Sequence, residues 1–231
     1  MRTISDKELC HDRLGDRFQE ALSQYDTERR LEILVDRFLP ADRLSGREAL
    51  EVGAGLGFFS RRMQERGAVV TASDIGEGLL SRIKESVGCR CEQVDALSLA
   101  QHFGKDRFDV VLSSECIEHT PDPLEAVRQM AAVLKPGGWL SLSTPNVVWY
   151  PVVRAATLLK LRPFDGLENF STFGSLRKTL KASGVEVAEE YGLHLFPFQV
   201  PLHGLSRWCD GHFQPLRKCM INICILGRKA C

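Results

Sequence analysis

The most constraining feature of this sequence is a run of three alternate glycines, Gly53, Gly55 and Gly57, between two segments of different character. Residues 49–52 form a short apolar run typical of a buried strand, and residues 58–66 have the spacing of a helix. Glycines at such a turn let the backbone approach a ligand closely, and the N-terminus of the following helix favours an anionic or polar group. The sequence therefore predicts a ligand-binding turn between a strand and a helix.

The same alternation of strand and helix continues along the chain, which makes a mostly parallel sheet covered on both faces the expected fold. Besides the two segments above, strands are expected at 69–73, 108–113, 139–143, 185–191 and 220–226, and helices at 14–39, 76–86 and 123–134. Gly137 and Gly138 are expected to break the chain before the strand at 139–143. We therefore predict one doubly wound α/β domain with a decorated C-terminal end.

The spacing of the glycines separates two kinds of cofactor. The dinucleotide fingerprint G-x-G-x-x-G needs a third glycine at position 58, where Phe58 stands. The observed pattern, Glu51-x-Gly53-x-Gly55-x-Gly57, resembles the first motif of the class I S-adenosylmethionine-dependent methyltransferases. The resemblance implies a Rossmann-like, mostly parallel seven-stranded sheet with an antiparallel C-terminal strand. It also implies a single domain, in which an N-terminal helical lid (1–45), a cofactor-binding core (46–145), a second lid after strand five (146–170) and a C-terminal decoration (192–217) follow one another.

Two acidic residues complete the resemblance at the cofactor site. Asp74 ends the second strand, where the family places a carboxylate that accepts both ribose hydroxyls. Asp95 and Ala96 follow the third strand, where the family places an acidic side chain near the adenine amino group and a backbone N–H near the ring. The residues that the resemblance assigns to S-adenosyl-L-methionine are Glu51, Gly53, Gly55, Gly57, Asp74, Ile75, Asp95, Ala96 and Ser114.

A Glu-x-x-Glu-His segment after the fourth strand carries the candidate chemistry. If this turn is helical, Glu115, Glu118 and His119 stand at positions i, i+3 and i+4 on one face. Two carboxylates and an imidazole suit Mg²⁺ or another divalent metal, so these three residues are the candidate metal ligands. The alternative is a site without metal, in which His119 is the base or only shapes the pocket. Glu118 and His119 are the candidate catalytic residues in either case.

This segment resembles two narrower families. One contains the ubiquinone-biosynthesis O-methyltransferases (the methyltransferase type 11/12 group), and the other the small-RNA 3′-terminal 2′-O-methyltransferases, which add a later histidine to the metal site. Residues 167–173 contain no histidine, so Asn169 or water would have to substitute. The Pro145-Asn146 turn and the partly apolar residues 147–163 resemble the ubiquinone group, which favours that assignment. This second lid either covers the pocket or contacts a membrane interface peripherally.

Composition narrows the range of partners. Thirty Lys and Arg balance thirty Asp and Glu, so a nucleic-acid partner is disfavoured. Eight cysteines show no disulfide framework, and no apolar run is long enough to span a membrane. Because residues 1–8 also lack the apolar stretch of a secretory signal, we expect reduced thiols and a cytoplasmic location.

These observations predict an S-adenosylmethionine-dependent O-methyltransferase. Its expected substrate is a small hydroxylated molecule, such as a quinone precursor, a phenol or a natural product, and it is lipophilic if the second lid serves it. One alternative is a methyltransferase of a nucleic-acid terminus or of a nucleotide- or lipid-linked sugar. Another is a non-catalytic methyltransferase-like partner protein, since a fold alone does not fix a function.

Overall fold

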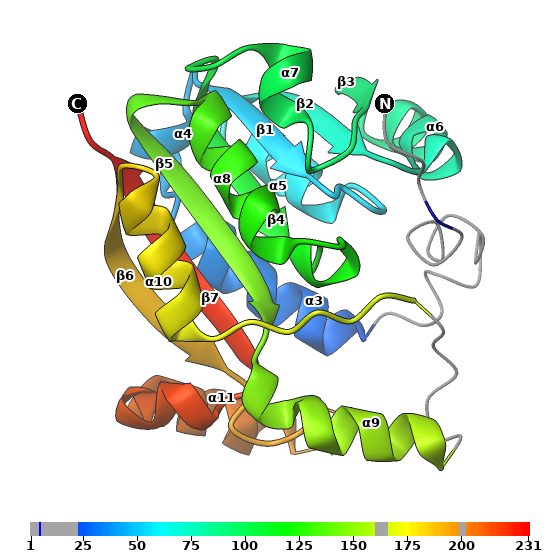
Figure 1. Ribbon diagram of the computed structural model, residues 1–231, viewed down its shortest axis with the longest axis vertical. Coiled ribbons are helices and arrows are strands. Elements are labelled where there is room, and N and C mark those ends of the chain that lie inside the picture. The colour runs from blue at the N-terminus through cyan, green and yellow to red at the C-terminus, as the bar shows by residue number, and fades with distance from the viewer. Residues whose placement is uncertain (1–4, 6–22, 160–165, 199–201) are drawn as a thin grey trace.

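Seven strands form one sheet with helices on both faces (Figure 1), in a computed structural model that describes residues 5, 23–159, 166–198 and 202–231. The sheet order is β3-β2-β1-β4-β5-β7-β6. The strands are β1 (Glu48–Val52), β2 (Val69–Asp74), β3 (Arg90–Gln93), β4 (Phe108–Ser114), β5 (Leu134–Pro145), β6 (Val185–Leu193) and β7 (Asn222–Lys229). Of these strands, β7 runs antiparallel to both of its neighbours, and the other pairs are parallel. The predicted doubly wound sheet with an antiparallel C-terminal strand is confirmed.

The helices pack on the two faces of the sheet and enclose two hydrophobic cores. One face is covered by α3 (Gln24–Leu31), a π-helix (Glu32–Arg37), α5 (Phe58–Glu65) and α6 (Glu77–Ser86). The other face is covered by α7 (Leu99–Phe103), α8 (Pro123–Val133) and α10 (Phe173–Ala182). In β4, Val110 and Leu112 point to the first core and Val111 to the second, and all three are fully buried. Burial on both faces explains why this strand is a continuous apolar run in the sequence.

The predicted break at Gly137 and Gly138 is wrong, because β5 runs without interruption from Leu134 to Pro145. Gly137 adopts a φ of 76°, and a Cβ on Gly138 would lie 2.8 Å from the carbonyl oxygen of Asp109. The pairing of β4 with β5 shifts register between Phe108 and Val110, as at a β-bulge. The glycines therefore permit a close backbone approach inside the strand, which is the other common use of glycine in a strand.

The predicted helix at 14–39 is partly corrected. Residues 14–22 lie outside the described residues, and within the described part the helix begins at Gln24 and changes to a π-helix at Glu32. It ends at residues 38–40, close to the expected place, and a further short helix, α4 (Ala41–Leu44), follows before β1. The buried Leu44 explains this, since it anchors the turn to the core.

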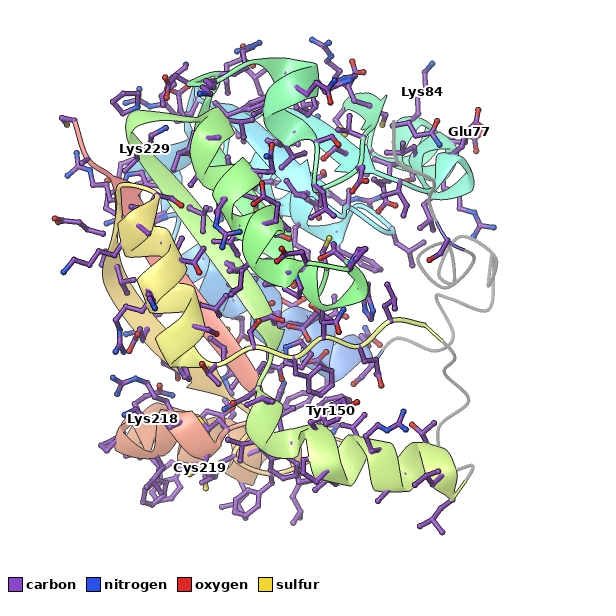
Figure 2. All side chains as sticks on the ribbon, in the orientation of Figure 1. Glu77, Lys84, Tyr150, Lys218, Cys219 and Lys229 are labelled. Carbon is purple, nitrogen blue, oxygen red and sulfur yellow. The ribbon has the colours of Figure 1, made fainter. Side chains whose placement is uncertain are left out.

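Two further helices gather at the end of the molecule where β5 finishes (Figure 1). A 3₁₀ helix (Val147–Trp149) leads into α9 (Tyr150–Leu158), and α11 (His203–His212) is followed by a 3₁₀ helix (Gln214–Cys219). The indole N–H of Trp149 donates to the carbonyl oxygen of Cys219 at 2.8 Å, which ties the two regions together. Figure 2 accordingly shows Tyr150 and Cys219 at the same end of the molecule. Among the described residues, no helix is long and apolar enough to cross a membrane.

Candidate functional site

A cavity opens at the carboxyl ends of β1, β2 and β4, which is where doubly wound folds bind their ligands. Eight of the nine predicted cofactor residues line it, namely Glu51, Gly53, Gly55, Asp74, Ile75, Asp95, Ala96 and Ser114. The predicted catalytic residue His119 lines it too, together with Glu115. The structure therefore brings the glycine turn and the Glu-x-x-Glu-His segment to one place, although about sixty residues separate them in the sequence.

The first and third glycines of the turn are required for different reasons. Gly53 has a φ of 72°, and a Cβ there would lie 2.3 Å from the Sγ atom of Cys116. Gly57 does not line the cavity: it has a φ of 77° and precedes α5, where a Cβ would press against Ile83 and Val87 at 3.1 Å. Gly53 thus keeps the turn against the segment after β4, and Gly57 lets α5 pack on α6.

Asp74 is held in place by the backbone of its own turn and of the glycine turn. Its Oδ1 atom accepts from the N–H of Gly76 at 2.9 Å, and its Oδ2 atom accepts from the N–H of Gly55 at 2.9 Å. Each carboxylate oxygen can accept more than one hydrogen bond, so the group keeps acceptor capacity for ligand hydroxyls. The side chain joins the ends of β1 and β2 and faces the cavity.

Glu51 lies deeper, at the floor of the same cavity, with an exposed fraction of 2%. Burial raises the pKa of its carboxyl to about 8, against the opposing effect of the hydroxyl of Ser60, which donates to it. A carboxyl with this pKa is mostly protonated at neutral pH. Glu51 therefore offers the cavity a neutral acid, whereas its partner Asp74 offers hydrogen-bond acceptors.

The predicted metal site does not fit the structure. The short 3₁₀ helix after β4 contains only Ile117–His119, so Glu115 stands before it, in a left-handed conformation with a φ of 50°. Glu115 and Glu118 consequently hydrogen-bond to different partners, and Glu118 lies beside His119. Within the described ranges, no three His, Cys, Asp or Glu side chains are grouped so as to hold a metal ion.

The partners of the two glutamates lie on neighbouring strands. Glu115 accepts from the hydroxyl of Ser143 at 2.9 Å and from the amide of Asn222 at 2.8 Å. Glu118 accepts from the hydroxyl of Thr144 at 3.1 Å. Burial raises the pKa of Glu115 to about 8 and that of Glu118 to about 7. Both carboxyls therefore bind protons near neutral pH, which is unusual for glutamate and common at functional sites.

His119 is oriented by a backbone carbonyl. Its Nδ1 atom lies 2.8 Å from the carbonyl oxygen of Leu167, and since that oxygen can only accept, Nδ1 carries the hydrogen. The neutral ring therefore has its basic lone pair on Nε2, which is 3.7 Å from Oε1 of Glu118. Asn169 lies beside them without serving a metal: its N–H donates to the carbonyl of Glu118, and its amide donates to the carbonyl of Thr120.

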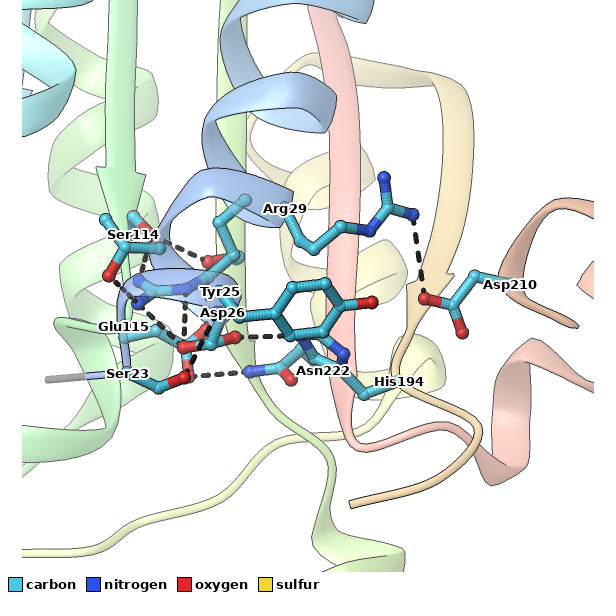
Figure 3. A network of polar contacts seen from close by, with 12 residues as sticks. Ser23, Tyr25, Asp26, Arg29, Ser114, Glu115, His194, Asp210 and Asn222 are labelled. Atoms are coloured by element: carbon cyan, nitrogen blue, oxygen red, sulfur yellow. Dashed lines mark hydrogen bonds and ion pairs between the residues drawn. The ribbon is translucent and has the colours of Figure 1, made fainter. Parts of the chain in front are cut away.

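A buried polar network beside the cavity was missed by the sequence analysis. Arg30 of α3 donates through Nη1 to the hydroxyl of Ser114 at 2.8 Å and forms an ion pair with Asp26 at 2.9 Å. Asp26 also contacts Nε2 of His194 at 2.9 Å, as Figure 3 shows. Arg30 lines the cavity. Burial opposes the charge of both Arg30 and Asp26, but their mutual attraction outweighs it, so the pKa of Arg30 is raised, that of Asp26 is lowered and both are charged.

No spacing rule marks these residues, because they come from distant segments. Asp26 and Arg30 lie four residues apart in α3, a spacing that ion pairs on exposed helix faces also have, and His194 follows β6. The available signal was the periodicity of α3, which puts both charged side chains on a buried face. His194 itself is fully buried and adopts a φ of 62°, so it belongs to the network, in contrast to the surface position that a lone histidine usually has.

Comparison with known proteins adds three findings. The sequence model of a methyltransferase domain family matches residues 23–190. A ubiquinone biosynthesis O-methyltransferase of Nitrosospira multiformis is 34% identical over 169 residues, which are 67% of this chain and 69% of that protein. Among solved structures, a magnesium protoporphyrin IX methyltransferase of Synechocystis with bound S-adenosylhomocysteine has a TM-score of 0.69 at 14% identity, over 98% of this chain and 100% of the other.

A second solved structure supports the same fold. An S-adenosylmethionine-dependent methyltransferase of Mesorhizobium loti has a TM-score of 0.65 at 20% identity, over 87% of this chain and 98% of the other. At these identities the two structures establish the fold, and the matches to the family model and to the Nitrosospira protein carry the assignment of the chain.

Proposed function

Because this chain belongs to the methyltransferase domain family and is an S-adenosylmethionine-dependent methyltransferase, we propose that it is a cytoplasmic O-methyltransferase with His119 as its base. The acceptor in this proposal is a small hydroxylated molecule of phenolic or quinone-precursor type. The name of the Nitrosospira relative supports an oxygen acceptor. The single observation that carries the proposal is the contact between Nδ1 of His119 and the carbonyl of Leu167.

That contact gives His119 the form a base needs. A neutral imidazole with hydrogen on Nδ1 can accept a proton only through Nε2. Glu118 lies beside Nε2 and, in its ionised form, stabilises the imidazolium that results. His119 and the glycine turn line the same cavity, so an acceptor hydroxyl bound beside His119 shares that cavity with the cofactor.

The cofactor residues fit S-adenosylmethionine by their chemistry. When bound, this cofactor supplies a methyl group attached to a cationic sulfur, and the sulfur keeps the bonding electron pair and leaves as a neutral thioether. Asp74 would accept from the ribose hydroxyls, and Asp95 would meet the adenine beside the apolar side chains of Ile75 and Val94. The backbone of Gly53 and Gly55 would accommodate the amino-acid end.

His119 and the cavity walls do the remaining work. The acceptor hydroxyl gives its proton to Nε2 of His119 as its oxygen forms the new C–O bond, and the imidazolium later releases that proton to solvent. Arg30, held by Asp26 and Ser114, places a fixed positive charge in the wall where the acceptor oxygen becomes negative. Holding both reactants in one cavity supplies much of the rate, since an in-line displacement depends mainly on position.

An apolar surface near the site supports a lipophilic acceptor. It consists of exposed side chains of α9, α11 and the 3₁₀ helices beside them: Val147, Val148, Tyr150, Val152, Leu158, Leu159, Leu202, Leu205, Trp208, Phe213 and Leu216. Figures 1 and 2 show α9 and α11 together at one end of the molecule. Apolar side chains of this kind would take a hydrocarbon tail or the interface of a membrane on which such an acceptor is delivered.

The proposal is tested by comparing two acceptors of the same shape. Labelled S-adenosylmethionine is incubated with catechol, which offers oxygen, and with o-phenylenediamine, which offers nitrogen. We expect a methyl ether of catechol and little transfer to the diamine, because neutral aromatic amines need no base and gain nothing from His119. Preferential transfer to the diamine would contradict an oxygen acceptor.

The same assay tests the reaction without a metal. Exhaustive treatment with EDTA is expected to leave the transfer to catechol unchanged, because Glu115 and Glu118 are bonded to Ser143, Asn222 and Thr144. Loss of activity that Mg²⁺ restores would show that these side chains rearrange around a metal.

A further inference from the structure

A second cavity lies at the opposite end of the sheet from the methyltransferase site. It has a volume of about 410 Å³ and is formed by α4 and the residues after it, the starts of β4 and β5, and the end of β7 (Figure 1). The residues that line it are Asp42, Arg43, Arg47, Asp109, Pro136, Gly137, Gly138, Trp139 and Arg228. The methyltransferase site lies at the other end of β4, which is about 20 Å away along a seven-residue strand.

Three arginines meet at this second cavity, and none of them forms an ion pair with a carboxylate of the described residues. Most arginines in the described part of the chain have an acidic partner within 4 Å, such as Arg62 with Asp36. Arg43, Arg47 and Arg228 have no such partner. Arg43 instead donates to the carbonyl oxygen of Phe38, and Arg228 donates to that of Gly137. A carbonyl oxygen orients a guanidinium without neutralising it, so most of the donors and all of the charge of these side chains stay available.

Two of the three guanidinium groups lie against the same side chain, that of Trp139. The central carbon of the Arg43 guanidinium lies 3.8 Å from the centroid of a Trp139 ring, and that of Arg228 lies 5.1 Å from it. Two like charges that share one aromatic side chain repel each other, and the ring attracts each of them only weakly. An anion between them would remove this repulsion, because guanidinium groups bind oxyanions with paired hydrogen bonds.

The acidic residues of the cavity do not balance the arginines. Asp109 is committed to Lys135, whose Nζ atom lies 3.1 Å away, and to the backbone N–H of Glu48 at 3.0 Å. These contacts, with Arg47 nearby, leave the pKa of Asp109 lowered, so Lys135 and Asp109 form a neutral pair. Asp42, which is exposed, is the other carboxylate among the lining residues, so the three arginines outnumber the carboxylates and leave the cavity positive.

We propose that this cavity is a binding site for a doubly charged oxyanion, the phosphoryl group of a small molecule or free phosphate. Arg43 and Arg228, positioned by Trp139, take the oxygens of the group, and Arg47 adds charge at the rim. The site is separate from the methyltransferase cavity and shares no lining residue with it. Its ligand is therefore neither the methyl donor nor the acceptor.

The test uses phosphate, pyrophosphate and AMP as probes of the intact protein at low ionic strength. Binding is measured by calorimetry and by the tryptophan fluorescence that guanidinium movement over Trp139 changes. We expect saturable binding that weakens with salt, and a loss of affinity of ~10-fold or more in each of Arg43→Gln and Arg228→Gln. Tighter binding of AMP than of phosphate, measured with the methyltransferase cavity saturated by S-adenosylhomocysteine, would identify the phosphoryl group of a larger molecule as the ligand.

Arg61→Gln is the matched control, since Arg61 also donates to a backbone carbonyl, that of Ser86, outside this cavity. Its affinity for the probes is expected to equal that of the unchanged protein. Affinity for S-adenosylhomocysteine, measured in every variant, reports whether the protein is folded. The proposal is overturned if the unchanged protein binds none of the probes, if Arg61→Gln loses as much affinity as Arg43→Gln, or if only a polyglutamate peptide binds, which would indicate an acidic protein partner.

Discussion

The two halves of the methyltransferase cavity are built in different ways. The half around the glycine turn is made by backbone conformation within short motifs, as the contacts of Gly53 and Asp74 show. The opposite half is made by side chains that segments far apart in the sequence bring together, such as Arg30 of α3 with Ser114 at the end of β4. The first half recurs across a family because its geometry is local, whereas the second depends on the packing of the whole domain and is free to differ between members.

The largest effect should come from breaking the ion pair that the second half depends on. Arg30→Gln leaves Asp26 buried without its cation, and we expect it to lower the free energy of unfolding by about 3–5 kcal/mol. Chemical denaturation measures this. Arg62→Gln is the control, because its partners Asp36 and Glu28 are partly exposed and such pairs contribute about 0–1 kcal/mol. Equal losses in the two variants would mean that Arg30 is not the residue that holds this half together.

The pH dependence of stability should follow the buried carboxyl of the first half. Burial raises the pKa of Glu51 from 4.5 to about 8, so the folded protein binds this proton more tightly than the unfolded chain does. The resulting stabilisation is complete below pH 4.5 and is lost as the pH rises through about 8. It amounts to roughly 5 kcal/mol in full, of which roughly 3 kcal/mol is lost between pH 6 and pH 9.

Denaturation at pH 6 and pH 9 measures this loss. Glu51→Gln, which cannot ionise, should reduce the difference between the two values, and Glu77→Gln on the surface of α6 should not (Figure 2). An unchanged pH dependence in Glu51→Gln would show that Glu115 and Glu118, whose pKa values are also raised, account for it.

The need for glycine in the turn can be separated into backbone strain and collision. Gly53→Ala forces a left-handed backbone on alanine and drives its Cβ into Cys116, at a cost of about 2–3 kcal/mol. Gly88→Ala shares the left-handed backbone, with a φ of 74°, and has no atom within 4 Å of the new Cβ. It should cost about 1–2 kcal/mol and leave the affinity for S-adenosylhomocysteine unchanged. The affinity for S-adenosylhomocysteine is measured by calorimetric titration of both variants. An equal loss of affinity in the two would show that the collision with Cys116 is not what matters at Gly53.

The smallest expected effect concerns the ribose. Asp74→Asn keeps the shape of the side chain but turns one acceptor into an N–H₂ group, which must face the N–H of Gly55 or of Gly76. We expect the affinity for S-adenosylhomocysteine to fall by about 10-fold, equivalent to about 1.4 kcal/mol. Affinity for adenine alone should be unaffected, and a parallel loss for adenine would mean that the variant has distorted the turn.

The sequence predicted the half that is local and missed the half that is not. Glycine spacing and strand ends placed Gly53, Asp74 and Asp95 in one cavity, because parallel strands bring their carboxyl ends to one edge. The conformation after β4 could not be read, since i, i+3 and i+4 spacing describes a helix, and Glu115 instead adopts a left-handed conformation next to Ser143 and Asn222. The same limit applies at Gly137, where only the structure shows a close approach inside a strand.

The role of His119 is tested most directly by two measurements on the single variant His119→Ala. The account predicts that its affinity for S-adenosylhomocysteine stays within about two-fold of the unchanged protein, because the cofactor half is separate, while the transfer of methyl to catechol falls by about 10²–10⁴-fold. Full turnover in this variant would contradict the assignment of His119 as the base. A matching loss of cofactor affinity would contradict the division of the cavity into two halves.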